Sequence, residues 1–503
     1  MTIHECNDCH HEWVANTETT VAADEQIEQP YTDLGNARRL VADHGHDLRY
    51  APQWGSWLIW HNTRWQEDIT GETNRRAKAV VDGMITQQAT ITNDNERKAL
   101  HKHWQRSQAA SRLDAMIHVA TTEPGIPIRI DQLDADPWLL NTSSGALDLR
   151  TCAITGSDRR HLVTKLAPTT IDPDAQCPTW EWFLNWAMQG DTELVEFLRR
   201  AVGYSLTGTV GEQCLFFLHG GGANGKSTFL SVIQHLLGDY AFAAEADLLL
   251  ASNHERHSTG IADLHGRRIV VVQETDEGRR LDEALVKRLT GGDLITARRM
   301  RQDNFQFTPT HKLWMAANHR PTVRGTDHAI WRRIRMIPFT NSIDEKDQDH
   351  TLIDRLLAEL PGITQWALAG CNAWQTAGLR PPAAVLQATL DYRTEQDHIG
   401  RFVDECCTLA EGLTVSARDL RNAYETWCNE AGERPWSEKA MAPHLVDRGC
   451  VKQRTMDSRL WRHIALAGTA ATELSRRLDR GDWGKRASGD TPADHPVDDK
   501  ELF

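Results

Sequence analysis

Residues 214–228 read CLFFLHGGGANGKST, and this stretch decides the fold at the centre of the chain. It opens with a continuous apolar run, as expected of a strand that is buried on both faces. It continues with the full pattern G-x-x-x-x-G-K-[ST], from Gly220 to Ser227. Apolar residues then recur at helical spacing, at Phe229, Leu230, Ile233, Leu236 and Leu237. Strand, glycine-rich loop and helix in this order predict an α/β domain with a phosphate-binding loop (P-loop).

The loop has the composition that phosphate binding requires. Glycines let the backbone wrap around a phosphate so that several N–H groups point inward, and the helix N-terminus adds partial positive charge. Lys226 would reach the β- and γ-phosphates, and the Ser227 hydroxyl would hold Mg²⁺. A chance glycine-rich turn is the alternative, but the flanking strand and helix argue against it. The predicted nucleotide-binding residues are Gly220, Gly221, Gly222, Ala223, Asn224, Gly225, Lys226, Ser227 and Thr228.

Two later apolar runs lead to polar residues that could complete this site. The β-branched run 269–272 leads to Glu274. On a strand next to that of the loop, Glu274 would hold the Mg²⁺ shell or orient the attacking water, with Asp276 and Glu277 as alternatives. A third run ends at Asn318, which could sense the γ-phosphate or its water. The other interpretation is that Asn318 caps a turn.

Paired arginines, Arg332 and Arg333, precede another apolar strand at 336–339. They could pair with acids of their own chain. They could also reach the nucleotide of a neighbouring subunit as an arginine finger in trans. Both interpretations stay open at this point.

The composition is that of an ordinary soluble globular protein: 503 residues, 40% hydrophobic and 25% charged. No apolar run approaches the length of about 18 residues that spans a membrane, and the N-terminus has no secretory signal pattern. The ten scattered cysteines indicate reduced thiols in a cytoplasm. The net charge of −14 comes mostly from the acidic ends, so a basic surface for nucleic acid remains possible.

Changes in composition predict six segments along the chain. They are an acidic flexible tail with a CxxC pair (1–30), a Trp-rich module (31–125), a helical or α+β module (126–202), the P-loop ATPase domain (203–390), a winged-helix-like DNA-binding domain (391–468) and a disordered tail (469–503). Cys6 and Cys9, flanked by histidines, hint at Zn²⁺. The sequence has no second CxxC pair. Cys6, Cys9 and one or two histidines could form a minimal site, but we expect no metal there.

The winged-helix prediction for 391–468 rests on three patterns. Leu420, Tyr424, Trp427 and Cys428 define one helix face; Ser437 would cap a second helix with Met441, Leu445 and Val446 inward; residues 459–462 alternate like a wing strand. Lys439, His444 and Arg448 would be available for DNA. A helical docking bundle is the alternative.

Several motifs occur in a fixed order. After the phosphate loop come residues 271–275 (VVQET), 281–293 (LDEALVKRLTGGD), Ala297-Arg298, 317–321 (ANHRP) and 331–333 (WRR); before it come 141–149 (NTSSGALDL), 172–178 (DPDAQCP) and Gly203-Tyr204. This set, spread over residues 31–465, resembles the superfamily-three helicases of the phage and plasmid primase–helicase type, which are related to the poxvirus primase–helicase.

The resemblance implies an AAA+-like, superfamily-three ATPase core and a ring-forming, hexameric, ATP-driven DNA helicase. Such a protein would act on single-stranded or forked DNA in the replication of a phage or plasmid, in the cytoplasm of a bacterial host. By family pattern Lys226 and Ser227 bind ATP and Mg²⁺, Glu274 is the acid of the second motif, and Asn318 is the sensor.

The resemblance also implies a DNA-binding surface. Lys287 belongs to the family's extra motif, and residues 295–308 would form a hairpin that faces the central pore. Arg298, Arg299 and Arg301 would contact DNA phosphates there. A solvated basic edge strand is the other interpretation of these arginines.

Two departures from the family pattern limit what carries over. Gln273-Glu274 stands where many relatives place two acids, so Glu274 acts alone or with Asp276. The short acidic segment 1–30 leaves no room for a priming domain, so we expect this chain to unwind DNA and a separate primase or polymerase to prime.

The alternative function is an ATP-switched DNA-binding initiator or loader that separates no strands. A protein unfoldase fits less well, because its pore loop would be aromatic.

Overall fold

The computed structural model describes residues 3–5, 12–14, 31–251, 259–273, 278–299, 304–323, 328–432, 435–454 and 459–468. The chain packs as two compact units, one of residues 1–135 and 157–165 and one of residues 136–156 and 166–503. The six segments predicted from composition remain predictions. None of the described helices is both long and apolar enough to cross a membrane.

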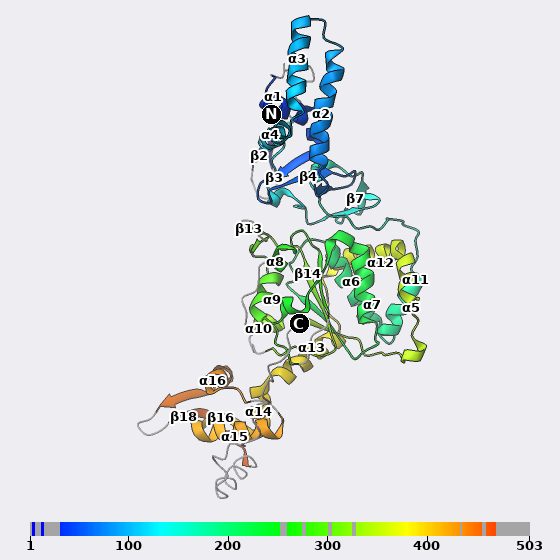
Figure 1. Ribbon diagram of the computed structural model, residues 1–503. Helices are drawn as coiled ribbons and strands as arrows, with labels where there is room; N and C mark the ends of the chain where they lie inside the picture. Colours follow the sequence, from blue (N-terminus) through cyan, green and yellow to red (C-terminus); the bar gives the residue numbers. More distant parts are fainter. Residues whose placement is uncertain are drawn as a thin grey trace, which may run out of the picture. The chain divides into compact units, whose positions relative to one another are not determined.

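The first unit combines helices with a small antiparallel sheet. The helices are α1 (Asp33–His44), α2 (Glu72–Gln88), α3 (Asp94–Ser107) and α4 (Ala110–Ala120), and the sheet contains β3 (Leu48–Ala51), β4 (Ser56–Trp60) and β5 (Trp65–Glu67) (Figure 1). Leu40, Val81, Leu100 and Met116 belong to its core. Two short strands, β1 (Ile3–Glu5) and β2 (Glu12–Val14), also pair. Cys6 and Cys9 lie outside the described residues.

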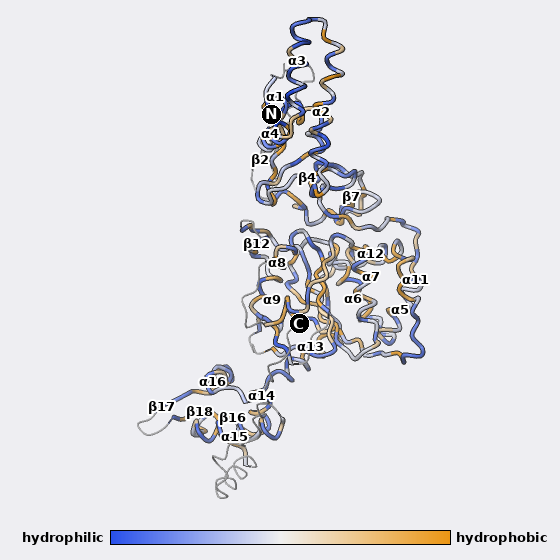
Figure 2. The backbone as a smooth tube through the Cα atoms, in the orientation of Figure 1, coloured by the Kyte–Doolittle hydropathy of each residue, from blue (hydrophilic) through white to orange (hydrophobic). Residues whose placement is uncertain are grey.

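The second unit is built on a parallel sheet of five strands, as predicted. Its order is β10 (Ala241–Ala244), β11 (Ile269–Gln273), β14 (Lys312–Ala317), β9 (Leu215–His219) and β15 (Ile334–Pro338). The strands carry mainly hydrophobic residues, whereas α3 of the first unit is mostly hydrophilic (Figure 2). The sequence predicted β11 as the neighbour of β9. That prediction is wrong, because β14 lies between them and pairs with both.

Helices surround this sheet. In Figure 1, α6 (Thr192–Leu206), α7 (Lys226–Leu237) and α12 (Leu360–Ala377) lie on one side of it, with α8 (Thr259–Ala262), α9 (Glu283–Thr290) and α10 (His328–Trp331) on the other. The remaining elements are α5 (Pro178–Ala187), α11 (Leu352–Ala358), α13 (Ala383–Gln396), the hairpin of β12 (Ile295–Arg298) and β13 (Asn304–Phe307), and a small sheet of β6 (Leu139–Thr142), β7 (Gly145–Asp148) and β8 (Ala153–Thr155).

The segment before the loop shares its hydrophobic core with the sheet. The Trp180 ring on α5 stacks on Phe229 of α7 at 5.6 Å between centroids, and Phe197 on α6 meets Phe216 of β9 edge-on at 6.3 Å. Leu147 of β7 belongs to the same cluster. This packing places α5 directly behind the glycine-rich loop.

The C-terminal module has a hydrophobic cluster of its own. It contains α14 (His398–Cys406), α15 (Ala417–Glu430), α16 (Glu438–Val446) and an antiparallel sheet of β16 (Cys407–Ser416), β18 (Arg459–Leu466) and β17 (Val451–Arg454). The predicted helix face, Leu420, Tyr424, Trp427 and Cys428, is buried, and the Ser437 hydroxyl accepts a bond from the Ala440 N–H at 3.3 Å.

Two predictions for this module are wrong. Val446 is exposed, because it follows buried Leu445 by one residue and so points about 100° away around the helix. His444 is buried against the ring of Trp436, and Arg448 forms an ion pair with Asp397. Neither side chain is therefore presented freely for DNA, whereas Lys439 is exposed.

Candidate nucleotide-binding site

A cavity of about 370 Å³ lies at the carboxyl end of the parallel sheet. It is lined by residues 222–228, by Gln273 at the end of β11, and by residues 316–319 at the end of β14. Parallel strands end at one common edge, so residues from three distant parts of the sequence meet here. The structure thus brings the glycine-rich loop and Asn318 to one cavity. Glu274, Asp276 and Glu277 lie outside the described residues.

At two positions of the loop, neighbouring atoms lie so close to the backbone that only glycine fits. A Cβ on Gly220 would lie 1.9 Å from the carbonyl oxygen of Phe339, which follows β15. Gly225 has a φ of +85°, and a Cβ there would lie 2.9 Å from the Phe183 ring on α5. The loop can therefore pack between β15 and α5 only with glycine at both positions.

Lys226 is buried, and its ammonium group is surrounded by oxygen atoms. The Nζ atom lies 2.8 Å from Gly220 O, 2.9 Å from Gly221 O, 3.0 Å from Asn224 Oδ1 and 3.0 Å from Asn318 Oδ1. Burial lowers the pKa of Lys226 to about 8. An ammonium has three N–H donors, so these four acceptors share them. Any phosphate that binds Lys226 must compete with them.

Asn224 has a structural role that its place in the motif did not indicate. Its Nδ2 donates to Gly221 O at 2.5 Å and to Phe339 O at 3.0 Å, and the side chain is 4% exposed. Asn224 therefore ties the loop to the end of β15 and helps to hold Lys226. The motif leaves this position unspecified, so no sequence signal pointed to it.

The two paired arginines differ in exposure, although both donate to Gln213 Oε1. Arg333 is buried, and its guanidinium donates to Thr290 Oγ1 at 3.1 Å and to Ala329 O at 2.6 Å. Arg332 is exposed and donates to Gln213 Oε1 at 2.9 Å. Neither arginine lines the cavity of its own chain. Arg333 thus braces α9 and α10, while Arg332 faces outward.

The predicted hairpin forms at β12 and β13, with Ile295 opposite Phe307. Phe305 and Phe307 point inward onto the ring of His265, whereas Arg298 is exposed. Arg299 follows β12 and is half-buried, as is Lys287 on α9. Arg301 lies outside the described residues.

Comparison with known proteins finds two matching families. Residues 37–189 match the family described as D5 N terminal like. Residues 218–333 match a family of unknown function.

Curated relatives come from large DNA viruses. The chain is 25% identical to the L207/L206 protein of Acanthamoeba polyphaga mimivirus, named a candidate helicase, over 76% of this chain and 44% of that protein. It is 28% identical to the 022R protein of Frog virus 3, also named a candidate helicase, over 46% and 26%. It is 24% identical to the C962R protein of African swine fever virus, named a candidate primase, over 60% and 34%. The chain spans less than half the length of these relatives.

A solved structure, the apo C-terminal region of NrS-1, aligns with 86% of this chain and all of that chain. The sequence identity is 11% and the TM-score is 0.49.

Proposed function

We propose that this chain, which belongs to the D5-like primase–helicase family, binds and hydrolyses ATP with Mg²⁺ to drive movement along DNA in a replication system. The observation that carries the proposal is the meeting of Lys226 and Asn318 at one cavity of the parallel sheet. A basic loop residue and a polar residue from the next strand are what a site needs to hold a terminal phosphate and respond to its loss.

The cavity has the size and polarity for a nucleotide. Its volume is within the range of small-molecule sites. The loop supplies backbone N–H groups at the start of α7, where the helix dipole favours anions. Ser227 is exposed at the cavity wall and would hold Mg²⁺ with Glu274. When bound, Mg²⁺ would neutralise charge on the phosphates. The role of Lys226 is to hold the terminal phosphates, and that of Asn318 is to orient the attacking water.

We propose that the protein binds and moves along single-stranded or forked DNA. Arg298 is exposed on β12, half-buried Arg299 follows that strand, and half-buried Lys287 lies on α9. Cations on a hairpin suit sequence-independent phosphate contacts. Arg301, which lies outside the described residues, is proposed to contact DNA as well.

A second copy of the chain is the proposed partner, in a closed ring such as a hexamer. Exposed Arg332 borders a groove of about 230 Å³ with Arg335, Leu386 and Leu390. The two leucines are 57% and 53% exposed. This basic and apolar surface would bind an acidic and apolar surface on the neighbouring copy of the chain.

Such an acidic face lies beside the loop. The Ile343 N–H donates to Ala223 O at 3.0 Å, and exposed Asp344, Glu345 and Asp347 follow Ile343 in the sequence, with Lys346 paired to Asp344 at 3.7 Å. Trp182, which is 55% exposed, is on neighbouring α5. Contact between the two faces would bring Arg332 toward the nucleotide of the next copy.

The decisive experiment is ATP hydrolysis by the purified chain with and without single-stranded DNA. Strong stimulation by DNA, abolished by Lys226→Ala, is expected of a motor and would justify a strand-displacement assay. Slow hydrolysis that DNA does not stimulate, with intact DNA binding, would favour the alternative of an ATP-switched initiator or loader. A phage or plasmid setting in a bacterial cytoplasm and a separate primase or polymerase remain part of the proposal.

A further inference from the structure

The segment that follows Asn318 is bonded to the last turn of α13. The Tyr392 hydroxyl donates to Pro321 O, and Arg320 forms an ion pair with Glu395. The Val323 N–H donates to Gln396 Oε1 at 3.0 Å. Tyr392 is fully buried. We call these three contacts the α13 clamp. They join α13 to the strand end that carries Asn318.

The residue after the clamp belongs to the C-terminal module. Asp397 accepts a bond from the Gly400 N–H at 2.9 Å, which caps α14, and forms an ion pair with Arg448 beyond α16. The next residue, His398, is buried and bonded to Tyr424 at 2.8 Å. Asp397 is therefore anchored inside the module.

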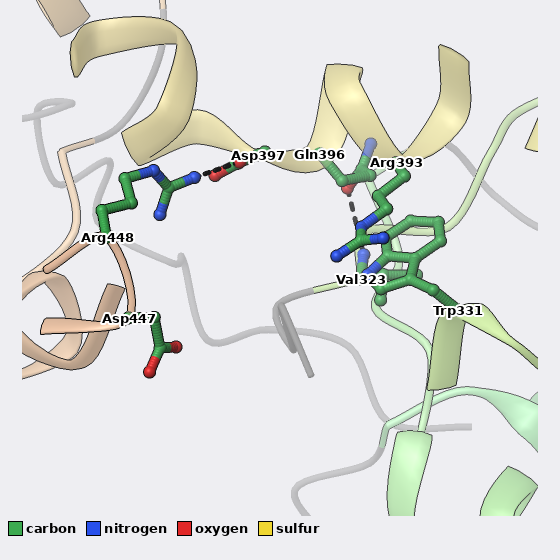
Figure 3. A pocket seen from close by; sticks show the side chains of 7 residues that line it. All are labelled: Val323, Trp331, Arg393, Gln396, Asp397, Asp447 and Arg448. Atoms are coloured by element: carbon green, nitrogen blue, oxygen red, sulfur yellow. Dashed lines mark hydrogen bonds and ion pairs between the residues drawn. The ribbon is translucent and has the colours of Figure 1, made fainter. Parts of the chain in front are cut away.

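Gln396 and Asp397 are consecutive, yet they are bonded in opposite directions. Figure 3 shows Gln396 directed at Val323 and Asp397 directed at Arg448, and both line a cavity of about 250 Å³. Consecutive Cα atoms are about 3.8 Å apart, so no flexible linker separates the two anchors. A rotation of the end of α13 must therefore move the start of the C-terminal module.

The series of contacts that ends at the C-terminal module begins in the candidate nucleotide site. Lys226 is bonded to Asn318, and Asn318 is followed within a few residues by the partners of the clamp, Arg320, Pro321 and Val323. A terminal phosphate that binds the Lys226 ammonium would weaken the hydrogen bond between Lys226 and Asn318. The strand end and the segment 319–323 would then be free to shift.

We propose that nucleotide binding is transmitted to the C-terminal module through Asn318, the segment 319–323 and the α13 clamp. The inference rests on the proposed nucleotide site and adds its regulation: the position of the C-terminal module depends on whether the cavity is filled. A clamp that serves only as a rigid strut would hold the module in one position in both states. The two cases differ in a measurable distance.

The test places two spectroscopic probes by site-specific, cysteine-independent labelling, at Thr376 on α12 and at Asn429 on α15, both exposed. The distance distribution between them is measured with and without a non-hydrolysable ATP analogue and Mg²⁺. We expect a shift in the native chain and its loss in Glu395→Ala/Gln396→Ala. The matched control is Gln387→Ala/Asp391→Ala, a bonded pair on the same helix that does not contact the segment 319–323.

A short Gly-Ser insertion between Gln396 and Asp397 is a second, independent variant. It leaves both anchors intact and is expected to abolish the shift. Binding of the analogue is measured separately by titration. Bound analogue with no shift in the native chain, or equal shifts in the clamp and control variants, would overturn the relay while leaving the nucleotide site standing. Failure of the analogue to bind would overturn the proposed nucleotide site itself, and the relay with it.

Discussion

The Nζ atom of Lys226 lies 3.0 Å from the Oδ1 atom of Asn318, which joins the start of α7 to the end of β14. The pairing depends on strand order: β14 is the direct neighbour of β9, with Ala317 opposite His219. In the β11–β14 register Gln273 lies opposite Ala316, two residues before the level of Asn318. The sheet order thus selects which polar residue meets the loop lysine.

Replacing Asn318 with alanine should slow ATP hydrolysis while leaving ATP binding nearly unchanged. Lys226 keeps its other three acceptors, so the KM for ATP should change little. Loss of a polar group that orients the attacking water should lower kcat by about 100-fold. Steady-state hydrolysis at saturating single-stranded DNA measures both constants. A raised KM with unchanged kcat would assign Asn318 to ground-state binding instead.

Asn224→Ala should destabilise the second unit. The variant removes a buried amide and leaves Gly221 O and Phe339 O without that donor, which costs about 1–3 kcal/mol in free energy of unfolding. Urea unfolding of the full chain measures the change. Asn185→Ala on α5 is the control, because that side chain is exposed and its loss should alter stability by less than about 0.5 kcal/mol. Equal effects in both variants would contradict the loop tether.

Local patterns predicted most of the elements that carry the site. The apolar run and glycine-rich loop at 214–228 and the buried face of α15 follow from periodicity and turn chemistry within short windows, whereas the hairpin at β12–β13 is expected from the family resemblance. Strand β9, helix α7 and the buried face of α15 lie where the local patterns predict them. The parallel character of the sheet followed from the alternation of apolar strands and helices.

Long-range packing supplied what sequence reasoning missed. The place of β14 between β9 and β11 depends on how whole strands pack. The burial of His444 depends on Trp436, and that of Arg333 depends on Thr290. Cationic and imidazole side chains are usually exposed, so the hydrophobic pattern of the sequence does not indicate their burial.

Arg332 and Arg333 should differ sharply when each is replaced by alanine. Arg333→Ala removes the guanidinium that donates to Thr290 Oγ1 and Ala329 O inside the fold and should lower the free energy of unfolding by about 2–4 kcal/mol. Arg332→Ala should change stability by less than about 0.5 kcal/mol, because the side chain is exposed. Its effect should instead fall on ATP hydrolysis by the assembled protein.

Mixing tests whether Arg332 acts in trans. Arg332→Ala subunits keep a complete cavity, and Lys226→Ala subunits keep Arg332, so a mixed assembly should recover part of the hydrolysis that each variant lacks. Light scattering checks that both variants still assemble. Leu386→Asp/Leu390→Asp should instead give monomers. An inactive mixture of assembled variants would exclude a contribution of Arg332 to a neighbouring site.

His311, at the start of the buried core of the sheet, should make stability depend on pH. It is 1% exposed, and neither ring nitrogen bonds a described residue. Burial, with the nearby charge of Lys312, lowers its pKa from 6.5 to about 3. The unfolded chain therefore binds a proton below about pH 6.5 that the folded chain does not bind. Stability from this group is present above pH 6.5 and is lost as the pH falls toward 3, by up to about 1.4 kcal/mol per pH unit.

His311→Leu should therefore flatten the fall in the free energy of unfolding between pH 7.5 and pH 5. Urea titrations of both proteins at several pH values give the two slopes. Buried Lys312, whose pKa is also lowered by burial, acts in the same direction in both proteins, so the difference between them isolates His311. Replacement of exposed His235 by leucine controls for the general loss of a histidine. An unchanged slope in His311→Leu would show that the imidazole is already protonated, or accessible to water, in the folded chain.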